Sequence, residues 1–142
     1  MESLGILGGG QLGRFFTISA QKMGYSVIVF DPDDKSPAGK IANKHICKPY
    51  DDLDALDELK DSCRSVTTEF ENIPAETLRY LEKHIIVRPS SETVSIAQNR
   101  IKEKDFLKRC GMPVGNYVVI DTIESINNLD SNKVLILSLI HI

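Results

Sequence analysis

Almost at its start the 142-residue chain carries the stretch Ile6-Leu7-Gly8-Gly9-Gly10-Gln11-Leu12-Gly13-Arg14. A short apolar run, residues 4–7, leads into the glycines, and the residues after them carry apolar side chains at helical spacing: Leu12, Phe15, Phe16, Ala20 and Met23. The glycines therefore lie between a predicted strand and a predicted helix. They fit the pattern G-x-G-x-x-G, in which glycine permits a tight turn, a close backbone approach to a ligand, and close packing of helix on strand. The start of such a helix also attracts an anion.

Two interpretations of this turn stay open, because glycine triplets also make plain tight turns. Asp31 favours a ligand site, since it closes the apolar run 27–30 near the spacing at which an acidic side chain meets a ribose hydroxyl in dinucleotide-binding folds. Asp31 could equally start a turn, because Asp31-Pro32-Asp33-Asp34 is good turn chemistry by itself.

Composition excludes several classes of protein. With 42% hydrophobic and 26% charged residues the chain is typical of a globular protein, of one domain or one domain and part of another. The net charge is −3 and basic residues are scattered, so we expect no nucleic-acid binding. No apolar stretch is long enough to cross a membrane and no signal peptide is evident, so we expect a cytoplasmic protein.

The three cysteines are far apart and form no C-x-x-C pair. We therefore expect reduced, mostly buried thiols. His45 and Cys47 could face one way on a strand as metal ligands, but a zinc site needs three or four protein ligands and no companions are evident. We expect no metal site.

Strand-like and helix-like segments alternate along the chain. Predicted strands lie at 4–7, 26–30, 45–48, 65–68 and 85–87. Between them we expect the first helix and a short helical segment at 40–44. A further helix should be capped by Asp51 or Asp52 and have Leu56 and Leu59 on its apolar side. The last should have Pro74 in its first turn and direct Leu78 and Leu81 inward. This alternation predicts an α/β fold, a Rossmann-like parallel sheet flanked by helices. Ligands bind such sheets at the carboxyl ends of the strands.

A second polar cluster, Glu69, Glu71 and Asn72, follows the predicted strand 65–68 and so falls on the same rim as the glycine turn and Asp31. Two carboxylates and an amide there could hold ribose or imidazole groups, or a cation. They could instead cap the helix that begins at Pro74, where acidic groups and Asn are favoured.

From Ser90 the pattern changes. Residues 90–99 predict one helix, and 100–110 a highly charged one with Phe106 and Leu107 inward. Residues 117–120 and 133–137 are strand-like, and Asp121 with Glu124 fits a capping box. We interpret these as the first elements of a second domain.

With both clusters placed, the sequence resembles the N-terminal part of the 5-(carboxyamino)imidazole ribonucleotide synthases, the ATP-grasp carboxylases of bacterial purine biosynthesis. The resemblance covers roughly residues 4–120 in order. It rests on 8–14 and on Asp31-Pro32-Asp33 with Ser36-Pro37-Ala38, Tyr50-Asp51-Asp52, Glu69-Phe70-Glu71-Asn72-Ile73-Pro74, Arg88-Pro89-Ser90, and Gln98-Asn99-Arg100 followed by Glu103-Lys104.

This resemblance implies a Rossmann-like pre-ATP-grasp domain at 1–98 and the incomplete start of an ATP-grasp domain at 99–142. It implies an enzyme that uses ATP and Mg²⁺ to activate bicarbonate and carboxylates the exocyclic amine of 5-aminoimidazole ribonucleotide, and we expect the intact protein to be a homodimer. The substrate-binding residues it implies are Gly10, Gln11, Leu12, Arg14, Asp31, Glu69 and Asn72. It also implies that Arg100 contacts ATP. The alternative interpretation of both Arg14 and Arg100 is an exposed charged side chain that has no role in function. No catalytic residue or metal ligand is expected in this stretch.

The departure from the family lies at the end of the chain. Family members continue with a lysine that binds ATP, a glycine-rich loop and the carboxylates that hold Mg²⁺, whereas this chain has the apolar residues 135–142. We expect a truncated or frame-shifted product, foreign to the family from about residue 136 and inactive alone. The competing interpretations are an NAD-binding Rossmann domain, another ATP-grasp ligase such as the formate-dependent glycinamide ribonucleotide transformylase, and a non-catalytic piece that associates through a face left uncovered.

Overall fold

The computed structural model describes residues 2–120, 122 and 124. The chain divides into two compact units, Met1–Ser95 and Ile96–Ile142, and each is described here by itself. The predicted capping box at Asp121 and the predicted strand 133–137 lie outside the described residues, as do the residues from 136 on.

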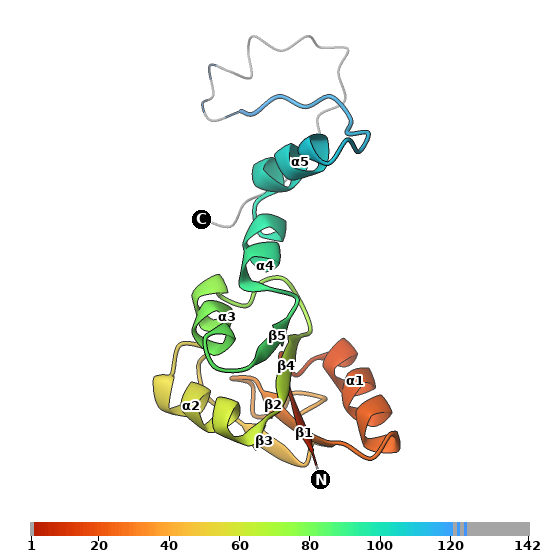
Figure 1. Cartoon of the computed structure of the whole chain (residues 1–142), viewed down its shortest axis with the longest axis vertical. Helices are drawn as coiled ribbons and strands as arrows, with labels where there is room; N and C mark the ends of the chain where they lie inside the picture. Colours follow the sequence, from red (N-terminus) through yellow and green to blue (C-terminus); the bar gives the residue numbers. More distant parts are fainter. Residues whose placement is uncertain (1, 121, 123, 125–142) are drawn as a thin grey trace. The chain divides into compact units, whose positions relative to one another are not determined.

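The first unit is built on one five-stranded parallel sheet (Figure 1). Its strands lie in the order β3-β2-β1-β4-β5. Their bounds are β1 Ser3–Leu7, β2 Ser26–Phe30, β3 Lys44–Ile46, β4 Ser65–Thr68 and β5 Ile86–Arg88. The predicted α/β class and parallel sheet are confirmed. The chain builds outward from β1 to β3 and then returns to place β4 on the other side of β1, so the strand order reverses between β1 and β4.

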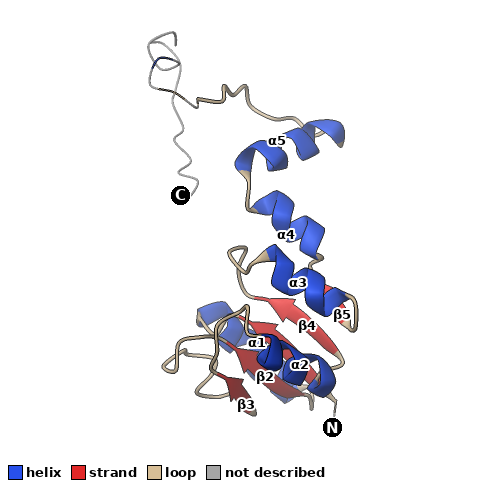
Figure 2. Cartoon of the chain, turned by 90° about the vertical axis from the view of Figure 1, so that its left-hand side faces the viewer, coloured by secondary structure: helices blue, strands red, loops and turns tan. Residues whose placement is uncertain are grey.

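Helices cover both faces of this sheet (Figures 1 and 2). Helix α1, Gln11–Lys22, lies on one face, while α2, Leu53–Ser62, and α3, Ala75–Glu82, lie on the other. Because side chains alternate along a strand, neighbouring residues enter different cores. Leu7 and Phe30 join the core under α2 and α3, and Ile6 and Val29 join the smaller core under α1.

The core under α2 and α3 follows the predicted pattern. Leu56, Leu59, Leu78 and Leu81 are at most 1% exposed. Asp52 caps α2, because its Oδ1 accepts a hydrogen bond of 3.0 Å from the amide of Ala55. Pro74 is the N-cap residue of α3 and so lies just before the helix that was predicted to contain it.

Helix α1 shows an unusual distribution of side chains. Its buried residues are small, namely Gly13, Thr17 and Ala20, whereas its large apolar residues are half-buried or, as Leu12 and Phe15, exposed. Small side chains allow the helix to lie close on the sheet, so the helix was predicted correctly but most of its bulky side chains do not enter the core.

Three local predictions are wrong. Residues 40–43 form turns and bends rather than a helix, and Lys44 already begins β3. Asn43 holds this segment in place, because its Oδ1 accepts hydrogen bonds from Val27 N at 2.9 Å and Gln21 Nε2 at 3.0 Å. In the second unit, α5, Arg100–Arg109, buries no residue, and Phe106 is 42% exposed. Residues 117–120 form no strand. The predicted helix at 90–99 is the shorter α4, Ser91–Ala97.

Among the residues that the structure describes, no helix is both long and apolar enough to cross a membrane.

The cysteines differ sharply in environment, and the expectation that they are mostly buried is wrong. Cys63 is buried in the core under α2, and burial raises the pKa of its thiol to about 12. Cys47 and Cys110 are exposed.

We predict that a thiol reagent at pH 8 modifies Cys47 and Cys110 in the folded chain but spares Cys63. The Cys63 thiol stays protonated far above neutral pH, and the thiolate is the reactive species. Mass spectrometry of the alkylated peptides before and after denaturation is the measurement. Modification of Cys63 in the native chain as fast as the other two would contradict the assigned burial.

Leu81→Ala should lower the free energy of unfolding by about 2–5 kcal/mol, because this side chain is fully buried and its loss leaves a cavity. Leu53→Ala is the matched control: Leu53 starts α2 but is 59% exposed, so the change should stay within about 0.5 kcal/mol. Urea denaturation followed by circular dichroism measures both. Equal losses for the two variants would count against the assigned core.

Candidate functional site

Three loops meet at the carboxyl edge of the sheet, beside the point where the strand order reverses. Backbone hydrogen bonds fix where each loop starts: Gly8 N donates to Phe30 O at 3.0 Å and Glu69 N to Leu7 O at 2.9 Å. Crevices at this reversal point are where open α/β sheets bind ligands. The structure thus brings together the glycine turn, Asp31 and Glu69, as the sequence predicted.

The Glu69 carboxylate sits on the first amides of α1. Its Oε2 accepts from Gly10 N at 2.5 Å and its Oε1 from Leu12 N at 3.1 Å. Helix α1 has no side-chain cap at Gly10 and no acidic residue in its first turn, so Glu69 supplies the missing acceptor from the end of β4. The negative charge also lies at the positive end of the helix dipole. The alternative that Glu69 caps the helix after Pro74 is therefore wrong.

Asp31 binds the other side of the glycine turn. Its Oδ2 accepts hydrogen bonds from Gly9 N at 2.6 Å and from the Tyr50 hydroxyl at 3.0 Å. Its Oδ1 accepts from Asp33 N at 2.8 Å, which closes the turn that the sequence suggested. Asp31 therefore shapes both its own loop and the glycine turn, and a ribose contact stays a prediction.

Tyr50 has no role in the sequence argument, although it belongs to one of the motifs. Burial, and then the negative charge of Asp31, raise the pKa of its hydroxyl well above the ordinary value. The hydroxyl therefore stays protonated and remains a donor to Asp31. Its partner lies far away in the sequence, so no local pattern could have found it.

Two glycines explain why the turn accepts these carboxylates. Gly8 has φ +100°, a conformation that side chains rarely adopt. A Cβ atom on Gly10 would lie 3.1 Å from the Glu69 Cδ atom and closer still to Oε1. The second glycine of the pattern therefore makes room for the protein's own carboxylate.

The other predicted site residues lie around the glycine turn and its two carboxylates. Gln11 and Arg14 are exposed in the first turn of α1, and Asn72 is exposed in the loop after β4. Leu12 contributes its amide, while its side chain is 64% exposed. A contact between these four residues and a ligand stays a prediction.

Arg100 lies in the second unit, at the first position of α5. Its Nη1 pairs with Glu103 Oε2 at 2.6 Å, one helical turn further on. The contact with ATP stays a prediction.

His45 supports the loop that carries Asp31 rather than a metal. Its Nε2 lies 3.0 Å from the backbone oxygen of Asp31, so that nitrogen donates. Across the described part of the chain, no group of three or more His, Cys, Asp or Glu side chains could hold a metal ion.

A parallel sheet of this order, with a glycine turn at its reversal point and two carboxylates bound to that turn, defines a Rossmann-like domain. The family model of the ribonucleotide synthetase preATP-grasp domain matches residues 1–98, and the chain belongs to this family.

Several proteins known as N5-carboxyaminoimidazole ribonucleotide synthases or synthetases are similar to this chain. The N5-carboxyaminoimidazole ribonucleotide synthase of Bacillus subtilis is 40% identical over 119 residues, which are 84% of this chain and 31% of the relative. The Staphylococcus aureus synthetase, solved in complex with ADP, is 37% identical with a TM-score of 0.83, over 89% of this chain and 34% of the other. The Aspergillus clavatus synthase, solved with ADP and 5-aminoimidazole ribonucleotide, is 31% identical with a TM-score of 0.73, over 81% and 31%. The chain spans about a third of the length of these relatives.

We predict that Glu69→Gln lowers the free energy of unfolding by about 1–2 kcal/mol. The Gln side chain carries no charge at the helix start, and it has one acceptor oxygen for the two backbone amides of Gly10 and Leu12. Glu76→Gln is the control: Glu76 also lies in the first turn of a helix, α3, but it is exposed, pairs with Arg79 and caps no amide there, so its loss should cost at most about 0.5 kcal/mol. Urea unfolding at pH 7 measures both. Indistinguishable variants would refute the capping role of Glu69.

Proposed function

We propose that this chain forms the N-terminal, substrate-binding part of an ATP-dependent carboxylase that transfers a carboxyl group from bicarbonate to the exocyclic amine of 5-aminoimidazole ribonucleotide, in purine biosynthesis. The observation that carries the proposal is the Glu69 carboxylate held at the start of α1, on the rim where this fold binds ligands. The relative solved with ADP and 5-aminoimidazole ribonucleotide supports the choice of substrate. Because the chain spans a third of its relatives, we expect no turnover from it alone.

The two carboxylates favour one orientation of the ribonucleotide. Glu69 and Asp31 already occupy the amides that would otherwise attract an anion. A phosphate placed there would face two negative charges, whereas an amine or a ribose hydroxyl would find hydrogen-bond acceptors. We infer that the amine and ribose end of the substrate faces Glu69 and that its phosphate lies further away.

The remaining residues of the proposed site surround that end. The exposed Gln11 side chain and the exposed Asn72 amide each offer both a donor and an acceptor. Gly10 and Leu12 supply the backbone that holds Glu69 in place. Arg14, one residue beyond Gly13 and exposed, is our candidate for the phosphate.

In the proposed reaction the γ-phosphoryl group of ATP is transferred to a bicarbonate oxygen and ADP is released. The amine nitrogen then forms a bond to the carboxyl carbon and loses a proton, while the bond from that carbon to the phosphorylated oxygen breaks and inorganic phosphate leaves. The contribution of this chain is to bind and orient the amine. We propose ATP as a substrate, with Arg100 as one contact, and Mg²⁺ as the metal that would screen the phosphates. The described residues include no carboxylate cluster suited to Mg²⁺, so we assign no metal ligand among them.

The proposed partners are small molecules: 5-aminoimidazole ribonucleotide, bicarbonate and ATP. Nucleic acid is not among them, because the net charge is −3 and basic residues are scattered. No membrane partner is proposed either. We propose a cytoplasmic protein that is a homodimer when intact.

The NAD-binding alternative fits the glycines less well now that their contacts are known. A dinucleotide pyrophosphate needs the free amides of the helix start, and Glu69 occupies two of them. The acidic residue that would meet the ribose, Asp31, is engaged by Gly9 and Tyr50. A ligase for glycinamide ribonucleotide would differ only in the amine substrate, so a direct comparison of ligands must separate the two.

Calorimetric titration of the 142-residue chain tests the proposal. We expect saturable binding of 5-aminoimidazole ribonucleotide, weakened about 10- to 100-fold by Glu69→Gln, because one hydrogen bond to a charged acceptor is lost. Glu76→Gln should bind as the parent chain does. Glycinamide ribonucleotide and NADH are the competing ligands. Saturable binding of either one, without a response to 5-aminoimidazole ribonucleotide, would contradict the proposal.

A further inference from the structure

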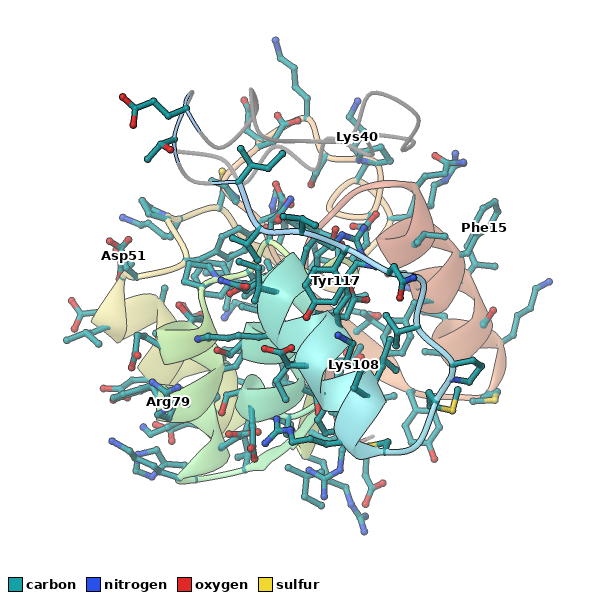
Figure 3. All side chains as sticks on the ribbon, turned by 90° about the horizontal axis from the view of Figure 1, so that it is seen from above. Phe15, Lys40, Asp51, Arg79, Lys108 and Tyr117 are labelled. Atoms are coloured by element: carbon teal, nitrogen blue, oxygen red, sulfur yellow. The ribbon has the colours of Figure 1, made fainter. Side chains whose placement is uncertain are left out.

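Tyr50 joins the loop that precedes α2 to the candidate site. Its hydroxyl donates to Asp31 Oδ2 at 3.0 Å, and the same oxygen accepts from Gly9 N at 2.6 Å. One carboxylate oxygen therefore links the tyrosine to the backbone of the glycine turn. The next residue, Asp51, is exposed and directed outward at the edge of the domain (Figure 3), so the loop turns only one of these two side chains toward the site.

The body of Tyr50 is anchored in the domain. Its backbone oxygen accepts a hydrogen bond of 2.8 Å from Thr77 Oγ1, and Thr77 is buried in the first turn of α3. Its ring packs against the core under α2 and α3, with 5.5 Å between its centroid and that of the buried Phe30 ring. Because a tyrosine side chain is rigid, a ring held in this way also fixes the hydroxyl.

The Asp31 side chain has no comparable anchor of its own. The backbone of Asp31 is fixed by β3, since its amide donates to Ile46 O at 3.1 Å and its oxygen accepts from His45. The carboxylate is bound on Oδ1 by the amide of Asp33, which belongs to the same loop. Tyr50 is the contact that ties the carboxylate to the core of the domain.

The tyrosine holds Asp31 without cancelling its charge. Burial, the charge and hydrogen bond of Asp31, and the charge of Glu69 raise the pKa of the Tyr50 hydroxyl. The hydroxyl therefore keeps its proton at neutral pH and presents a donor to the carboxylate. Because this donor is neutral, Asp31 keeps the negative charge that an amine or a hydroxyl of a ligand would meet.

We propose that Tyr50 is a positioning residue for the ribonucleotide site. It acts without touching the ligand: it holds Asp31 Oδ2 on Gly9 N, and so fixes the glycine turn whose next amides bind Glu69. This inference rests on the proposed function and deepens it, because it names what keeps that substrate site in shape.

Calorimetric titration of the 142-residue chain with 5-aminoimidazole ribonucleotide is the first test. In Tyr50→Phe the ring and its packing remain and the hydrogen bond to Asp31 is lost, so we expect the dissociation constant to rise about 10-fold. Tyr80→Phe is the matched control. The Tyr80 hydroxyl also donates to a carboxylate, Asp57 Oδ1 at 2.6 Å, but this pair joins α2 to α3 outside the candidate site. Tyr80→Phe should bind the ligand as the parent chain does.

A double-mutant cycle separates positioning through Asp31 from a general loss of packing. Tyr50→Phe should cost about 10-fold in the parent chain but less than about 2-fold in Asp31→Ala, because its partner is already absent there. Equal costs in the two backgrounds would overturn the inference.

The amide of Gly9 gives a readout that needs no ligand and leaves Asp31 unchanged. In the ¹H–¹⁵N spectrum of the chain, Tyr50→Phe should shift the Gly9 resonance, because the carboxylate bound to this amide loses its anchor. Tyr80→Phe should leave the resonance in place. A Gly9 resonance that Tyr50→Phe does not move would count against the positioning role.

The titration also separates this inference from the proposed function. Binding by the parent chain that Tyr50→Phe leaves unchanged, or that Tyr80→Phe weakens equally, would overturn the role of Tyr50 and leave the proposed function standing. A parent chain that does not bind 5-aminoimidazole ribonucleotide would overturn the proposed function, and this inference with it.

Discussion

The arrangement of the first unit depends on one carboxylate. Helix α1 begins at a glycine turn with no acceptor of its own, and Glu69 reaches from the end of β4 to bind the amides of Gly10 and Leu12. Unpaired amides at a helix start are costly when shielded from water. The same contact ties β4 to the opening β1–α1 segment at the point where the strand order reverses, so it supports both the helix and the site.

A glycine pattern of this kind specifies a backbone shape and leaves the charge of the ligand open. In dinucleotide-binding folds the amides of such a turn hold a pyrophosphate. Here Asp31 and Glu69 hold them instead, and the Tyr50 hydroxyl donates a hydrogen bond to Asp31. The rim thereby changes from a surface that attracts anions to one that accepts hydrogen bonds from amines and hydroxyls.

Helix α1 connects this site with the outer surface of the domain. Its small inner residues let it lie close on the sheet, which places the amides of its first turn within reach of Glu69. On its outer side Leu12 and Phe15 remain exposed. Both properties follow from the order of small and large residues along one helix.

The sequence by itself determined the alternating elements, the bounds of β2 and β4, and the inward side of α3, because strand and helix periodicities are local properties. It also placed Asp31 and Glu69 on one rim, since parallel strands end at the same edge. Only the tertiary structure decided that Glu69 caps α1, that Tyr50 binds Asp31 and that Phe15 faces outward. Those contacts join residues far apart in the chain, and they depend on strand order and on how closely α1 approaches the sheet, which no local pattern specifies.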